Sequence, residues 1–254
     1  MPPGTGTVLN VLAILLGASL GVLVGHRLPD RTRLVVTDGL GLVTLLLAGL
    51  NAASVLDPAL GAAVGASAPL LVVLGAVLLG GIAGSLLRIE ERLEDLGNAL
   101  QGRLAGRAAA APAAGAAERQ RFLEGFVTAS LVYCVGPLAI LGPLSDGLGR
   151  GIEQLALKSA LDGFASIAFA ASLGSGVAAS ALAVAVVQGG FTLGGLLMGD
   201  LVPAAHVAAL TATGGVLLAG VALRLLRVRP VPVGDLLPAL LLAPLLTELV
   251  ARLR

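Results

Sequence analysis

The sequence is poor in charged residues, in aromatic residues and in the residues that build metal or disulfide sites. Only 12% of its 254 residues are charged, whereas about 25% is usual for soluble domains. One cysteine and two histidines are too few for a disulfide framework or a Cys/His metal cage. A net charge of +1 leaves no basic footprint for nucleic acid. We therefore expect no metal, no nucleic-acid partner and no ordinary soluble fold.

Long apolar segments are what the chain has in abundance. Hydrophobic residues make up 57% of it, with a mean hydropathy of +0.99. A helix needs about 20 mostly apolar residues to cross a bilayer. Eight segments fit, namely Thr7–Gly25, Leu34–Leu56, Ala68–Leu87, Phe122–Leu141, Leu155–Leu173, Gly176–Met198, Ala208–Leu226 and Leu236–Val250. The sequence predicts an all-α membrane bundle of seven or eight helices, the short last segment either crossing or re-entrant.

The basic residues predict the orientation of this multi-pass bundle. Twelve of the 16 lysines and arginines lie in three alternate connections, which begin near Arg27, Arg88 and Arg224. Cytoplasmic connections are enriched in such residues. We therefore expect these three connections inside the cell and both termini outside.

The long connection divides one polytopic membrane domain, residues 1–254, into two parts. A first part of about 1–87 and a second of about 122–254 flank residues 88–121. Apolar residues recur at three- and four-residue steps over Leu86–Leu104, which predicts an amphipathic helix. Ala105–Ala117 is rich in Ala, Gly and Pro, a composition typical of a flexible linker.

Two internal similarities point to different symmetries. Gly75–Ile89 matches Gly214–Val228 at nine of fifteen positions, which indicates a parallel repeat. Asp38-Gly39 in the second segment echoes Asp162-Gly163 in the fifth, which indicates an inverted repeat. Duplication of either kind is common in transporter folds.

Small residues recur along one face of the first segment. Gly17, Gly21 and Gly25 are four residues apart, so they stack and let another helix backbone approach closely. The stripe serves packing within the chain and packing between copies in a homo-oligomer equally well.

The fifth segment carries two charges that are costly in lipid. Lys158 and Asp162 are four residues apart and share a helix face, which Ser166 extends by one turn. A functional interpretation is a polar cavity in which Asp162 binds a cation or proton and Lys158 is its counter-charge. The structural alternative is a neutralised pair near the outer surface, with Lys158 reaching water.

Possible helix breaks and buried amides add to this candidate site. Gly136-Pro137 interrupts the fourth segment, and Gln188-Gly189-Gly190 lies in the middle of the sixth. Interrupted helices coordinate solutes near the midplane of transporters, although a kink satisfied by neighbouring helices is equally open. Asn10 in the first segment is expected to hydrogen-bond across the same cavity.

Enzyme motifs are missing from the sequence. The only lysine, Lys158, lacks the glycine spacing of a phosphate-binding loop. The G-x-S-x-G letters at Gly17–Gly21 fall in a predicted membrane helix, whereas the nucleophile elbow needs a strand-turn-helix context. We therefore expect no enzyme activity, no catalytic residues and no cofactor.

Several strings together resemble a known family. They are GTVLN, LRIEERLEDLG, GFVTASLVYCVGPLAILG, LALKSALDGFASIAFAASLGSGV, VVQGG and VGDLLPALLLAPLL. They are similar to the YqgA/YdfK-type bacterial membrane proteins, labelled domain of unknown function 554, over Gly6 to about Leu246. The resemblance implies a bacterial inner-membrane protein without an assigned activity. It places Asn10, Gly136, Pro137, Lys158, Asp162, Gln188 and Pro238 at motif positions, whereas Asp235 stands where the pattern has asparagine.

Two functions of different classes fit these observations. The first is a secondary transporter or permease for a small solute or ion that works without ATP, with the lipid bilayer and the solute as its partners. Its predicted site joins Lys158, Asp162 and Ser166 to the broken helices and to Asn10. The alternative is a non-catalytic membrane scaffold or regulatory subunit that docks a partner through the Leu86–Leu104 helix.

Overall fold

A computed structural model describes the protein over residues 2–25, 27, 29–92, 95, 116–134, 137–198 and 203–253. These residues form helices and turns, with no strand among them. The α-helices are α1 (Thr5–Gly25), α2 (Asp30–Ala52), α3 (Pro58–Val64), α4 (Pro69–Leu86), α6 (Ala116–Cys134), α7 (Pro137–Gly147), α8 (Glu153–Leu173), α9 (Gly176–Met198), α10 (Ala204–Leu225) and α11 (Pro238–Arg252). Two short 3₁₀ turns are η1 (Ala53–Leu56) and η2 (Gly234–Leu236). The all-α membrane bundle expected from the sequence is confirmed.

Seven described helices are long and apolar enough to cross a membrane, and the α6–α7 pair makes eight if it counts as one span. Lipid offers no hydrogen-bond partners, so apolar segments satisfy their backbone internally as helices. The fourth predicted segment, however, is broken. Its two parts, Gln120–Cys134 and Leu138–Gly147, are bent by 62°, because Pro137 has no amide hydrogen to continue the helix.

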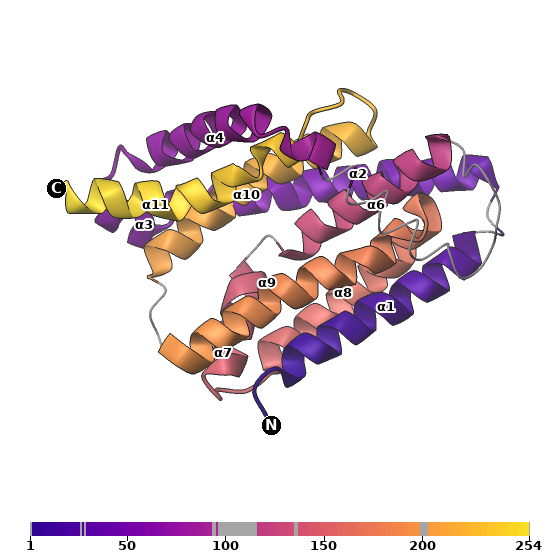
Figure 1. Ribbon diagram of the computed structural model, residues 1–254, viewed down its shortest axis with the longest axis horizontal. Coiled ribbons are helices and arrows are strands. Elements are labelled where there is room, and N and C mark those ends of the chain that lie inside the picture. Colours follow the sequence, from indigo (N-terminus) through magenta and orange to yellow (C-terminus); the bar gives the residue numbers. More distant parts are fainter. Residues whose placement is uncertain are drawn as a thin grey trace.

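The helices pack in two groups (Figure 1). The first group contains α1, α6, α7, α8 and α9; the second contains α2, α3, α4, α10 and α11. The groups meet where α2 contacts α8 and where α10 contacts α6 and α7. Both groups combine helices from the two ends of the sequence. α1 packs on α8 and α9, whereas α2 packs on α10 and α4 on α11.

The glycine stripe of α1 forms the contact with α8. A Cβ atom on Gly17, Gly21 or Gly25 would lie 2.2–2.6 Å from a backbone carbonyl oxygen of α8. The two helices run in the same direction, because Gly6 lies beside Leu155 and Gly25 beside Ala171. The small residues therefore serve close packing within the chain.

The arginine-rich connections gather at one end of the bundle, which we call the arginine-rich end. Arg121, Arg224 and Arg227 line one cavity there. Glu90 follows α4 and fixes the connection to this end: its carboxylate accepts hydrogen bonds from Arg224 (2.6 Å) and from the amide of Gly234 (2.5 Å). Asp235 accepts from the amide of Glu90 at 2.9 Å, a role that the oxygen of an asparagine fills equally well.

The last helix, α11, runs the length of α4 in the opposite direction. Asp235 lies beside Gly84, and Leu246 beside Gly75. At the far end of α11, Glu248 is 3.4 Å from His206, near the start of α10. The last segment thus extends from the arginine-rich end to the opposite end of the bundle, as a crossing helix does.

The short helix α3, which we did not expect, begins after Asp57, whose side chain accepts from the amide of Ala59 at 2.8 Å. Of the predicted amphipathic helix Leu86–Leu104, the structure describes residues 86–92 and 95 only, and the rest lies outside the described residues.

The similarity between Gly75–Ile89 and Gly214–Val228 extends to backbone geometry. α4 ends with Leu87 bonded to Ala83, and α10 ends in the same way with Leu226 bonded to Ala222. The next residue of each, Arg88 and Arg227, has a positive φ, of 52° and 56°. The similarity between Asp38-Gly39 and Asp162-Gly163 does not extend to their surroundings, because Asp38 is exposed and Asp162 is buried.

Candidate functional site

A charged pair lies inside the first helix group on α8. The Lys158 ammonium is 3.0 Å from Asp162 Oδ1 and 2.7 Å from Oδ2. Each residue is 6% exposed. Asp162 is the tenth residue of the 21 in α8, which is the middle of the helix. The pair is therefore central and enclosed, and Lys158 does not reach out to water.

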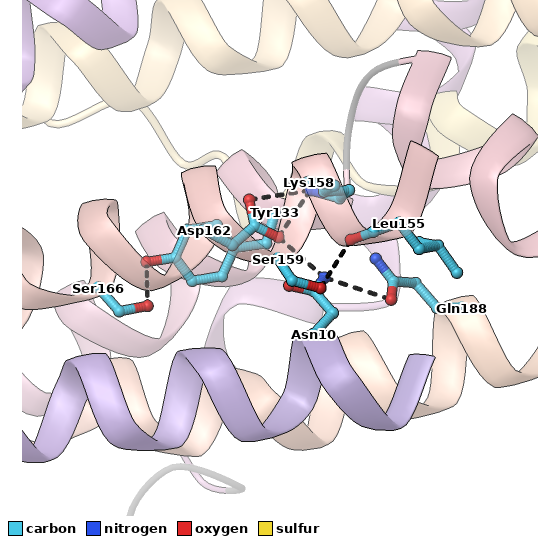
Figure 2. A network of polar contacts seen from close by, with 8 residues as sticks. All are labelled: Asn10, Tyr133, Leu155, Lys158, Ser159, Asp162, Ser166 and Gln188. Atoms are coloured by element: carbon cyan, nitrogen blue, oxygen red, sulfur yellow. Dashed lines mark hydrogen bonds and ion pairs between the residues drawn. The ribbon is translucent and has the colours of Figure 1, made fainter. Parts of the chain in front are cut away.

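Two amides from other helices complete this cluster (Figure 2). Asn10 of α1 donates its Nδ2 hydrogens to Asp162 Oδ2 at 2.9 Å and to Gln188 Oε1 of α9 at 3.3 Å. A carboxylate only accepts hydrogen bonds, which fixes the nitrogen of Asn10 toward Asp162. Three helices thus meet at one carboxyl group.

The same amides leave two polar atoms without partners. Asn10 Oδ1 and Gln188 Nε2 are buried and have no hydrogen-bond partner among the described residues, and both residues are 0% exposed. An unpartnered buried polar atom costs about 1–3 kcal/mol. One acceptor and one donor are therefore available beside the charged pair to a group that both donates and accepts.

One turn beyond Asp162, the stripe continues into a hydroxyl pair. Ser166 Oγ of α8 lies 2.8 Å from the hydroxyl of Tyr133, at the end of α6. The rings of Tyr133 and Phe169 form a T-shaped contact, with 6.3 Å between centroids. Tyr133 comes just before the α6–α7 bend, so the broken helix contributes to the network through this hydroxyl.

In the opposite direction the polar stripe continues between α1 and α9. Thr7 and Thr192 place their hydroxyl oxygens 3.1 Å apart. Beyond them, the buried Asp146 of α7 accepts from the backbone amides of Gly4 and Gly6, at 3.2 and 3.0 Å. Its carboxylate satisfies amides at the positive N-terminal end of α1.

The structure brings most of the predicted site residues together. Asn10, Lys158, Asp162 and Gln188 share one hydrogen-bonded cluster, with Ser166 one turn away. Gly136 lies outside the described residues, as does the side chain of Pro137, which begins α7.

The predicted break at Gln188-Gly189-Gly190 is wrong. The helix α9 is continuous from Gly176 to Met198. Glycine retains its amide hydrogen and continues the ladder at a cost of about 1 kcal/mol, whereas proline lacks the donor. Gln188 contributes its side chain to the site without any break in its helix.

Sequence reasoning missed Tyr133, Thr7 and Thr192. A signal for Tyr133 existed, since it is the only tyrosine in the chain and lies three residues before Gly136. The threonines gave no signal, because a hydroxyl inside a membrane helix commonly bonds within its own helix.

A separate apolar cavity lies between the two helix groups. It measures about 600 Å³ and is lined by α6, α7, α9, α10 and α11, with Ser130 and Cys134 as its polar or sulfur-bearing residues. Gly190 lines it, whereas Asn10, Lys158, Asp162, Ser166 and Gln188 do not. In the part of the chain that is described, no three His, Cys, Asp or Glu side chains group as metal ligands would.

Comparison with known proteins places the chain in a family. A family model described as "Protein of unknown function (DUF554)" matches residues 5–248. The "Uncharacterized protein YqgA" of Escherichia coli (strain K12) is 30% identical over 238 residues, 94% of each chain. The "Uncharacterized membrane protein YdfK" of Bacillus subtilis (strain 168) is 27% identical over 94% of this chain and 93% of its own. No solved structure matches significantly. The model match and the relatives at full length show that this multi-pass membrane protein belongs to the DUF554 family.

Proposed function

We propose that the protein is a secondary transporter or permease that moves a small solute or ion across the bacterial inner membrane without ATP. One observation carries the proposal. Lys158 and Asp162 form a buried pair, with Asp162 at the middle of a membrane helix, and the pair is bonded to an amide network that leaves a donor and an acceptor unfilled.

The energetic cost of this arrangement favours a functional role. A charged residue at the centre of a membrane helix costs about 2.5–3.5 kcal/mol on insertion scales. Pairing offsets part of that cost, but apolar side chains of similar size commonly do as well or better. The two unpartnered amide atoms of Asn10 and Gln188 add to it. Stability alone therefore does not account for the cluster.

In this proposal each side chain of the cluster has a role. Asp162 is the group that takes up a proton or binds a cation, and Lys158 is its counter-charge. Asn10 joins α1 to both α8 and α9. A change of charge at Asp162 thus alters the contacts of three helices at once, while the α6–α7 bend gives the bundle a place to move.

Orientation completes the proposal. The arginine-rich end faces the cytoplasm and both termini face outside, because positively charged connections stay on the cytoplasmic side. The partners are the bilayer and the transported species, and no enzymatic step or cofactor is involved.

The test is the thermal stability of the purified protein against sodium, potassium, amino acids, organic acids and pH. A species that binds only the folded protein stabilises it by about 2.7 kcal/mol at one hundred times its dissociation constant. We expect one such species, and we expect its effect to vanish in Asp162→Asn and its flux to appear in proteoliposomes.

Two further variants make this test decisive. Asp162→Asn leaves Lys158 unpaired and risks about 3–5 kcal/mol of stability, so Lys158→Gln combined with Asp162→Asn provides a pair-neutral protein. Asp38→Asn removes an exposed carboxylate from α2 and is the matched control. A stabilising effect that persists in the pair-neutral protein, or a flat panel with the wild type, contradicts the proposal.

A further inference from the structure

A second cavity, lined by several polar residues, lies at the arginine-rich end, and neither Lys158 nor Asp162 lines it. It measures about 290 Å³ and sits between α2, α6, α8 and α10. Besides three leucines, its lining residues are Thr37, Arg121, Glu124, Ser172, Arg224 and Arg227. Three arginines and one glutamate thus line a small space where two helices end.

The charges of this cavity are only partly compensated. Arg224 is paired with Glu90, at 2.6 Å. Among the described lining residues, the remaining charges are Arg121 and Arg227 against Glu124, an excess of one positive charge within that set. Arg121 donates through Nη2 to the carbonyl oxygen of Ser172 at 2.9 Å, which uses one of the five N–H donors of its guanidinium.

One lining residue, Ser172, carries an unpartnered hydroxyl. Ser172 is 3% exposed, and its Oγ has no hydrogen-bond partner among the described residues. A carbonyl-capping role at the end of α8 accounts for Arg121 but not for this hydroxyl or for Arg227. Guanidinium groups beside a free hydroxyl donor match the chemistry of a tetrahedral oxyanion, whose oxygens accept several hydrogen bonds.

We propose that this cavity binds a phosphate-type oxyanion. The ligand is either the head group of an anionic phospholipid at the membrane surface or a free phosphate from the aqueous side. Basic pockets between membrane helices bind such head groups, and the volume of 290 Å³ accommodates a group of this size. The site stands independently of the charged pair on α8.

The test measures thermal stabilisation of the full-length protein in detergent by two probes. One arm adds inorganic phosphate at constant ionic strength, with chloride as its control. The other adds phosphatidylglycerol, with phosphatidylcholine as its control. Stabilisation by phosphate alone assigns a free anion, and stabilisation by phosphatidylglycerol alone or by both probes assigns the lipid-accessible site. No stabilisation by either probe overturns the proposal.

Variants separate this site from general attraction to positive charge. Arg227→Gln removes a lining guanidinium and is expected to weaken binding of the active probe about ten-fold. Arg88→Gln is the matched control, since Arg88 also follows a helix at positive φ but its side chain is 73% exposed outside the cavity. Equal weakening in both variants overturns the proposal.

Ser172→Ala provides a readout that a purely structural role would not give. Removing an unpartnered hydroxyl leaves the melting temperature without ligand unchanged or higher, yet it is expected to weaken probe binding several-fold. Unchanged binding in both Ser172→Ala and Arg227→Gln contradicts the assignment.

Discussion

Replacement of Gly17 by alanine tests whether the α1–α8 contact holds the polar network together. The added methyl group would lie 2.2 Å from the carbonyl oxygen of Gly163 and 3.0 Å from Ser166 Cβ. Non-bonded heavy atoms prefer separations of about 3.5–4.0 Å, so the helices must move apart by roughly 1 Å. The hydrogen bond from Asn10 to Asp162, now 2.9 Å, then stretches beyond a useful length.

The expected loss of stability follows from these changes. Overpacking costs about 1–3 kcal/mol, and loss of a hydrogen bond to a charged group about 1.5–3 kcal/mol. The better helix propensity of alanine returns about 1 kcal/mol. We expect Gly17→Ala to unfold about 3 kcal/mol more easily, which lowers the melting temperature by roughly 6–12 °C for a chain of this size.

Thermal unfolding of the purified protein in detergent, followed by circular dichroism, measures this effect. Gly49→Ala on α2 is the control, because a Cβ atom there meets nothing within 4 Å. We expect its melting temperature to equal or exceed that of the wild type. If Gly17→Ala is as stable as the wild type, or Gly49→Ala loses as much, close backbone contact does not fix the position of α1.

Two further predictions concern the hydroxyl pair and the membrane orientation. Tyr133→Phe and Ser166→Ala each leave a buried hydroxyl unpartnered, so each is expected to lower the free energy of unfolding by about 1–3 kcal/mol. The double variant is expected to lose less than the sum of the two, because neither hydroxyl remains. Additive losses in thermal unfolding would show that the hydrogen bond contributes nothing to stability. In a Cys134→Ala background, a membrane-impermeant maleimide should label Arg252→Cys in intact cells and Arg88→Cys only after lysis, since both side chains are exposed at opposite ends of the bundle. The reverse pattern would place the arginine-rich end outside.

Much of the architecture could be read from the sequence because it depends on local properties. The apolar runs predicted the membrane helices, since a segment in lipid must satisfy its own backbone. The four-residue spacing of Lys158 and Asp162 predicted one shared helix face, and helix geometry fixes that relation. Loss of an amide donor at Pro137 likewise predicted the bend after α6.

Contacts between helices were decided only by the tertiary structure. In lipid, apolar side chains gain little by choosing one helix over another, so pairing depends on close backbone approach and on polar bonds. The stripe of Gly17 is visible in the sequence, but its partner α8 lies about 150 residues away along the chain. The convergence of Asn10, Gln188 and Asp162 and the position of Tyr133 beside Ser166 follow from the packing of α1, α6 and α9 against α8.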